Sequence, residues 1–287
     1  MIKALLKFIV SGCMLILPAL SHAQVGAVTG DLGTACSATG AVMAADGACT
    51  FTPTTYKIQI FEMGLCTAHP FGPARDLVTF DRTNCVTTYL DGAPAQVDIA
   101  SSLGGAPIAL TGTSSAPAEN TYSHAYMIMD DTFIVSGSFV DGGGDTHVSQ
   151  ADGTADTLAN GATLGEATNN LGNFGDNPNC DSGFHDAPIS GGTMDAYVTD
   201  DTLTRSVRAG QAGDVGGTST CTLNGRLTGV MSLATPVVVT SNTVSVVFNF
   251  DLTNQGVQFF DDDGSSDQVP DQFGSGPFSG SFTVINN

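Results

Sequence analysis

Alternation of apolar and polar side chains with a period of two restricts the fold of this chain more than any other feature. In VSVVFNFDL, residues 244–252, every second residue from Val244 to Leu252 is apolar, and Val247 is the one break in the pattern. Successive side chains of a β-strand point to opposite faces of a sheet. The stretch therefore predicts a strand with one buried face.

Other stretches repeat this pattern. TYKIQI, residues 55–60, alternates in the same way, and Gly64 is expected to bend the strand that follows. Residues 123–139 are long enough for two short strands or for one strand bent at Asp130–Asp131, and FSGSFTVI, residues 278–285, also alternates. No convincing helical period occurs, and the 35 glycines favour turns. The sequence predicts an all-β fold, a disulfide-tied β-sandwich (jelly-roll or Ig-like).

The first 23 residues have the three parts of a secretory signal peptide. Lys3 and Lys7 supply the positive end, residues 8–20 the apolar segment, and residues 21–23 a small-x-small cleavage site. A lipoprotein motif ending at Cys13 is the alternative, but the apolar run before it is short. No other window approaches the ~20 apolar residues of a membrane span. We expect a mature chain that is secreted, extracellular or periplasmic, without a membrane span.

Charge excludes several classes of partner. Cleavage removes Lys3 and Lys7, so the net charge moves from -20 to -22, and 28 acidic residues remain. Nucleic acids and anionic membranes are bound through Lys and Arg, which are scarce here. Disorder is contradicted by the 41% of hydrophobic residues. The composition predicts a folded acidic protein that attracts divalent cations.

An even set of cysteines predicts disulfides in an exported chain. Fifteen pairings are possible for six cysteines, and the simplest joins neighbours in the sequence. Zinc is the competing interpretation, but the chain has no C-x2-C pair. The expected pairs are Cys36 with Cys49, Cys66 with Cys85, and Cys180 with Cys221.

The chain divides unevenly after the signal peptide. Residues 24–53, which are small and apolar with two cysteines, are expected to form an N-terminal arm. Residues 54–287 are expected to form the β-sandwich domain. Within it, residues 141–226 are rich in Gly and Asp and contain only three aromatic residues, so they are expected to contribute little core. We interpret this stretch as a long insertion in the sandwich.

Calcium is the one ligand for which the sequence offers positive signals. Calcium takes clustered oxygen ligands in turning loops, and VDGGGD, GDNPNCD and FFDDDGSSD are such stretches. The third supplies Asp261, Asp263 and Asp267 as candidate calcium ligands. It is not an EF-hand loop, because Phe259 stands at the first position and Pro270 at the twelfth. A solvated acidic turn is the alternative interpretation.

Catalytic signatures are missing from the sequence. The histidines of the mature chain, His69, His124, His147 and His185, have no G-x-S-x-G or related motif beside them. The sequence has no tryptophan to form a sugar-binding platform, and it identifies no pair of carboxylates for glycoside hydrolysis. We therefore expect a protein that is not an enzyme.

Two function classes remain after these exclusions. The first is a non-catalytic structural or cell-surface protein that self-associates, as a subunit of an extracellular assembly. The alternative is an extracellular ligand- or glycan-binding module, with calcium dependence, that uses residues 141–226 as recognition loops. A general likeness to pilin-type sandwiches rests on fold class alone and implies no function.

Overall fold

The computed structural model describes residues 33–45, 47–103, 105, 107–174, 180–189, 191–206, 220–265 and 267–287. Nineteen β-strands and two short 3-10 helices, η1 (Ala100–Ser102) and η2 (Leu158–Asn160), lie within these residues. Every strand pair is antiparallel. The predicted all-β class is confirmed, and the predicted signal peptide lies outside the described residues.

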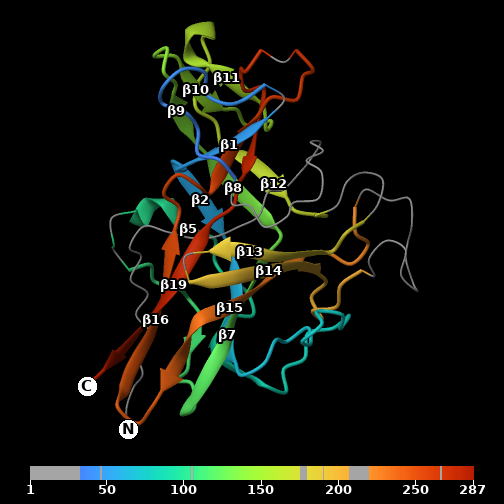
Figure 1. The fold of residues 1–287 in the computed structure, drawn as a ribbon, viewed down its shortest axis with the longest axis vertical. Helices are drawn as coiled ribbons and strands as arrows, with labels where there is room; N and C mark the ends of the chain where they lie inside the picture. The colour runs from blue at the N-terminus through green and yellow to red at the C-terminus, as the bar shows by residue number, and fades with distance from the viewer. Residues whose placement is uncertain are drawn as a thin grey trace.

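The largest sheet has seven strands and forms the lower part of the molecule in Figure 1. A two-stranded layer, β16 (Thr243–Asp251) and β19 (Ser279–Asn286), packs on one of its faces. Phe248 and Phe282 of this layer line a cavity of about 30 Å³ with Met127 and Met231 of the large sheet. The order of the large sheet is β13 (Gly183–Ile189), β14 (Gly192–Thr199), β15 (Arg226–Val239), β7 (Asn120–Asp130), β3 (Ile60–Cys66), β4 (Cys85–Leu90) and β6 (Thr113–Ser114).

Three smaller sheets complete the fold above the large one (Figure 1). Two continuous runs of chain join the smaller sheets to the large one. β2 (Thr55–Ile58) of a smaller sheet leads into β3 after Gln59, and β7 of the large sheet leads into β8 (Thr132–Ser136) after Asp131. The smaller sheets are β12 (Ala167–Asn170), β8 (Thr132–Ser136), β2 (Thr55–Ile58) and β5 (Val97–Asp98); β1 (Ala48–Phe51), β17 (Val257–Phe260) and β18 (Gln272–Ser275); and β11 (Ala155–Thr157), β10 (Thr146–Ser149) and β9 (Ser138–Val140).

The strands predicted from alternation are present. VSVVFNFDL forms β16 and FSGSFTVI forms β19, paired with Phe248 opposite Phe282. The break at Asp130–Asp131 is where β7 ends and β8 begins. The β3–β4 register shifts between Met63 and Gly64, which is the irregularity expected at that glycine.

All three disulfides have the predicted neighbour pairing. Cys36–Cys49 fixes the N-terminal arm to β1, which pairs with β17, so part of the arm belongs to a sheet. The cysteines of the second bridge, Cys66 and Cys85, lie directly opposite each other on β3 and β4. Structural disulfides persist in oxidising compartments. The covalent pattern therefore indicates an oxidising environment outside the cytoplasm.

Residues 141–226 contribute more core than the sequence suggested, so that expectation is wrong. They contain β10 to β14, and β14 lies inside the large sheet with partners on both sides. Because a central strand is covered on two faces and two edges, Tyr197 and Val198 are fully buried and Ala196 is nearly so. The interpretation of the stretch as an insertion stays a prediction.

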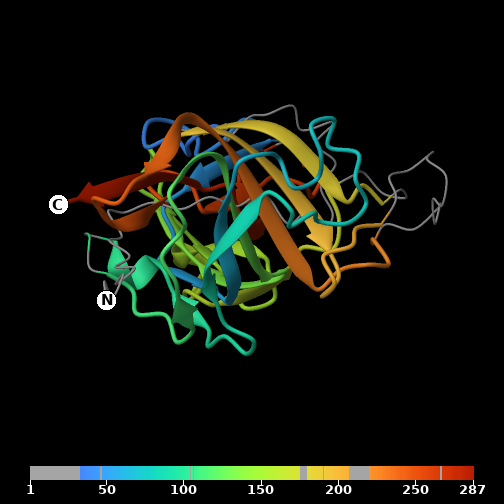
Figure 2. The same ribbon diagram turned by 90° about the horizontal axis from the view of Figure 1, so that it is seen from below.

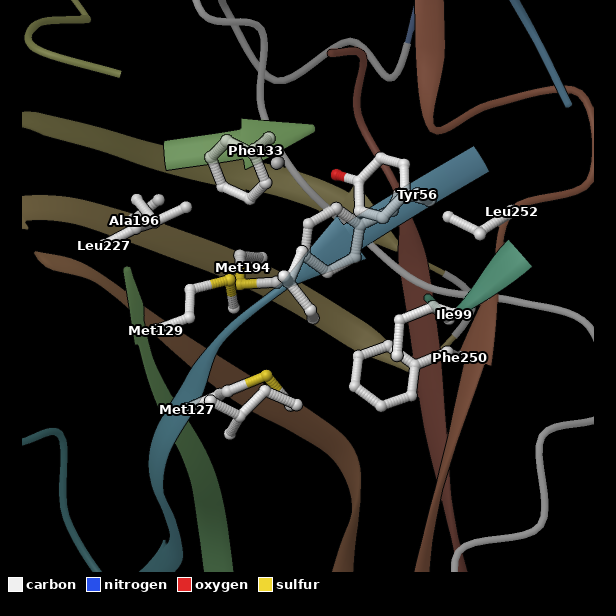
Figure 3. Packing of buried hydrophobic residues seen from close by; sticks show 14 of the residues in the cluster. Tyr56, Ile99, Met127, Met129, Phe133, Met194, Ala196, Leu227, Phe250 and Leu252 are labelled. Carbon is white, nitrogen blue, oxygen red and sulfur yellow. The ribbon is translucent and has the colours of Figure 1, made fainter. Parts of the chain in front are cut away.

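The principal core lies between the large sheet, the two-stranded layer of β16 and β19, and the smaller sheets. Figure 3 shows Met127, Met129 and Met194 of the large sheet, with Phe250 of β16 across from them. Flexible thioether side chains fill irregular space between layers better than branched ones. Large side chains from several sheets thus form one continuous core.

Alanine substitutions at two glycines of the large sheet, Gly64 and Gly229, are expected to change the stability in opposite ways. A Cβ on Gly64 would lie 2.4 Å from both the Tyr126 ring and the Val86 carbonyl oxygen, whereas a Cβ on Gly229 would first meet the mobile Met194 sulfur at 3.3 Å. We expect Gly64→Ala to cost about 3 kcal/mol of unfolding free energy through overpacking. Gly229→Ala should be neutral or stabilise by up to about 1 kcal/mol. Urea denaturation of both variants tests this, and equal effects would contradict it.

Candidate functional site

A buried carboxylate, Asp195 on β14, is the centre of a polar cluster on the outer face of the large sheet. Its side chain is 1% exposed. His69 Nε2 lies 2.9 Å and Arg75 Nε 2.7 Å from one carboxylate oxygen, and the backbone N–H of Asp186 donates to the other at 2.8 Å. The His185 ring nitrogen Nδ1 lies 3.8 Å from that second oxygen. We call these five residues the Asp195 cluster.

An irregularity in β13 brings the cluster together. The β13–β14 register shifts between Phe184 and Ala187, and Asp186 inside this bulge has a φ of 61°. Aspartate tolerates this left-handed conformation better than most residues. The bulge turns the Asp186 N–H toward Asp195, while the Asp186 carboxylate accepts two hydrogen bonds from Arg75 at 2.6 and 2.7 Å.

The environment of Asp195 strongly favours its ionised form. Burial by itself raises the pKa of Asp195, but His185, His69, the Asp186 N–H and the charge of Arg75 together lower it more. The net result is a pKa well below the usual range of an aspartate. Asp195 therefore stays charged at any physiological pH and holds its partners in place.

Two histidines of this region, His69 and His124, make packing and hydrogen-bond contacts. His69 Nδ1 accepts a hydrogen bond from the Phe71 N–H at 3.1 Å, so Nε2 carries the proton that Asp195 accepts. Both ring nitrogens of His69 are thus occupied. His124 packs edge-on against His69 with 5.5 Å between ring centroids, and burial first, then His69, lowers the pKa of His124. His124 Nδ1 lies 2.9 Å from the Ser123 hydroxyl oxygen.

The Asp195 cluster anchors residues 67–84, which we call the covering loop. The Cys66–Cys85 disulfide closes its two ends. Its Phe71 and Phe80 belong to a second apolar cluster on the outer face of the large sheet. Arg82 forms a bidentate ion pair with the buried Glu62, whose pKa is lowered because hydrogen bonds, the first from Arg82, outweigh the opposing effect of burial. This polar network has a structural role, which is to fasten the loop over the sheet.

The candidate calcium ligands lie in the loop between β17 and β18. Asp261 is buried and accepts the Gln268 N–H at 3.1 Å, whereas Asp263 accepts the Ser265 N–H at 2.7 Å and Asp267 the Val269 N–H at 3.0 Å. Asp263 and Asp267 therefore each cap an amide of their own turn, and Asp261 bonds across the loop. In the described part of the chain, no group of three or more His, Cys, Asp or Glu residues is placed to hold a metal ion.

The described residues of the other two acidic stretches do not form a group of metal ligands either. In VDGGGD, the Asp141 carboxylate accepts the N–H groups of Gly143 and Asp145, and it contacts His147 at 3.1 Å. Residues 175–179 of GDNPNCD lie outside the described residues. Calcium binding therefore stays a prediction that rests on the sequence.

That prediction is directly testable. If calcium binds only the native state, a concentration of 100 times the dissociation constant stabilises it by about 2.7 kcal/mol. We expect higher melting temperatures in millimolar calcium than in chelator. The double variant Asp263→Asn, Asp267→Asn keeps the turn-capping oxygens and should lose the shift. Coincident wild-type curves would assign these aspartates to turn formation alone, and an equal shift with magnesium would show that the loop does not select calcium.

A neutral region stands out on this acidic protein. Residues 99–118, 227–250 and 272–287 contain no charged side chain, although the chain carries a net charge of -20. The second and third stretches contain the paired strands β16 and β19. Val238 and Ile285 there are 50% and 40% exposed. We call the exposed part of these three stretches the neutral face.

A groove and the edge strand β16 lie at this neutral face. The groove, of about 280 Å³, separates the beginning of β16 from residues 115–119, and Glu119 is its one charged lining residue. Within the described residues, β16 pairs with β19 and with no other strand. The C-terminal end of β19 projects from the body of the molecule in Figure 2. The two-stranded layer is thus narrower than the sheet that it covers.

Sequence reasoning identified neither the Asp195 cluster nor the neutral face. His69 and Asp195 are 126 residues apart, and no local motif connects them. The neutral face could have been found by plotting charge along the chain.

Among the described residues, no helix has the length and apolar character needed to cross a membrane. The chain matches no family model, no curated protein and no solved structure.

Proposed function

We propose that this protein is an exported, non-catalytic structural component of the cell surface that works by self-association. The observation that carries the proposal is the neutral face, with β16 at the edge of its two-stranded layer, on a molecule of net charge -20. An unpaired strand presents free N–H and C=O groups that a further strand can use.

Electrostatics favours this face for contact between copies. Two chains of the same large negative charge repel each other at low ionic strength, and salt reduces that repulsion because the Debye length falls to about 10 Å at 0.1 M. A contact through this face brings few carboxylates together, because Glu119 is the one charged residue that lines its groove. The three disulfides support export into an oxidising compartment.

The proposal is tested on the purified mature protein and on cells. Sedimentation velocity should show assemblies of two or more copies whose fraction grows with protein concentration and with salt. Electron microscopy should find ordered assemblies on the cell surface or in concentrated protein. A strict monomer at every concentration and ionic strength would overturn the proposal.

The alternative function is an extracellular ligand- or glycan-binding module, with calcium dependence. The observation that favours it is the partly exposed pair His185 and Arg75, at 31% and 28%, beside the bulge of β13. Both side chains carry N–H groups at a partly exposed position, where they can face a polar ligand. A monomer that a glycan array retains, with retention lost in chelator, would replace the structural proposal.

A further inference from the structure

We infer that the groove at the neutral face binds a small primary alkylammonium ion, with Glu119 as its counter-ion. The inference goes beyond the proposed self-association and does not depend on it. The groove has a volume of about 280 Å³ and lies between residues 115–119 and the beginning of β16. Sites for small molecules are concave and largely apolar, with a few polar groups that fix the ligand. The apolar lining residues of the groove are Ala116, Pro117, Val239, Val244 and Val246.

The carboxylate of Glu119 is an isolated charge in this region. It is the one charged residue that lines the groove, and residues 99–118 and 227–250, which supply the other lining residues, contain no charged side chain. Glu119 is exposed and forms no ion pair or side-chain hydrogen bond with any residue that the structure describes. The groove distinguishes it from a carboxylate that is merely solvated, because the apolar walls can hold the carbon chain of a ligand whose charge the carboxylate binds.

Charge and lining together select the class of ligand. A protein of net charge -20 attracts cations and repels anions. A bare calcium ion takes six to eight oxygen ligands, often from several carboxylates, whereas this groove offers one carboxylate. An alkylammonium group needs one counter-ion and three hydrogen-bond acceptors. Ser241 and Ser245 line the groove, and their hydroxyls make no hydrogen bond to any described residue, so they can serve as acceptors beside Glu119.

Two matched probes test the charge requirement. n-Butylammonium and 1-butanol have the same carbon chain, and only the first carries a charge. In an NMR titration of dilute wild-type protein, we expect butylammonium to shift the signals of residues 115–119 and 239–246 and to bind about fivefold more tightly than 1-butanol, which is the effect of one exposed ion pair. Equal affinity for the two probes would overturn the inference. Shifts of equal size in the acidic loop at residues 261–267 would overturn it too, because they would show general attraction of cations.

A pair of variants tests the counter-ion. Glu119→Gln keeps the shape of an exposed side chain and removes its charge, so we expect a folded protein that binds butylammonium about fivefold more weakly. The control Asp201→Asn removes one charge from an exposed turn outside the neutral face and should bind butylammonium like the wild type. Wild-type affinity in Glu119→Gln, or an equal loss in the control, would refute Glu119 as the counter-ion. Sedimentation of the same samples keeps this result separate from the proposed self-association.

Discussion

Removal of the Cys180–Cys221 disulfide should lower the free energy of unfolding by about 4 kcal/mol. This loss is larger than the one that we expect for replacement of Asp195. The bridge closes a loop with a sequence separation of 41, and the loop entropy lost by the unfolded chain grows with that length. Both cysteines are 2% exposed, so alanine is the appropriate replacement. Urea denaturation of the double variant Cys180→Ala, Cys221→Ala gives the measurement.

The Cys36–Cys49 bridge provides a matched control. Its separation is 13, and the same relation gives about 3 kcal/mol for the double alanine variant. The order of the two losses therefore tests the entropic explanation, because both pairs are buried and both become alanine. An equal or smaller loss at Cys180–Cys221 would contradict it.

Replacement of Asp195 by asparagine should cost about 3 kcal/mol at pH 7. Asparagine keeps the shape but loses the charge, which leaves Arg75 and His69 facing an amide in a site where the aspartate was 1% exposed. Removal of one partner from a buried ion pair typically costs 3–5 kcal/mol, and the cost here falls at the lower end because Arg75 keeps Asp186. Chemical denaturation measures the loss.

Asp186→Asn is the control for this variant. Asp186 also contacts Arg75, but its side chain is 61% exposed, and asparagine tolerates the same positive φ. We expect a loss within about 1 kcal/mol, as for other exposed ion pairs. Similar losses for the two variants would mean that the burial of Asp195 is not the reason for its contribution to the free energy of unfolding.

The pH dependence gives a second test of the Asp195 cluster. Folding lowers the pKa of Asp195, so its contribution is complete above the unfolded value near ~3.9 and is lost as the pH falls toward the folded pKa. The stability difference between wild type and Asp195→Asn should be constant from about pH 7 to 5 and shrink between about pH 4 and 2. A difference that persists unchanged into acid would show that the carboxylate charge is not its source.

The sequence by itself determined the local elements and the covalent pairing. Period-two alternation located β16 and β19 because strand geometry alone assigns each side chain to a face. Asp130–Asp131 marked the boundary between β7 and β8, since polar residues interrupt an apolar run. Neighbour pairing was right for all six cysteines, because short loops bring their ends together at the lowest entropic cost.

Only the tertiary structure decided which of the many carboxylates matter. The acidic stretch at residues 259–267 drew attention in the sequence, yet its aspartates cap their own turns. Asp195 stands alone in the sequence, but β14 lies inside the large sheet, and the covering loop brings His69 and Arg75 to it from more than 100 residues away. Burial and partners come from long-range strand pairing, which local composition does not encode, so the low aromatic content of residues 141–226 wrongly suggested little core.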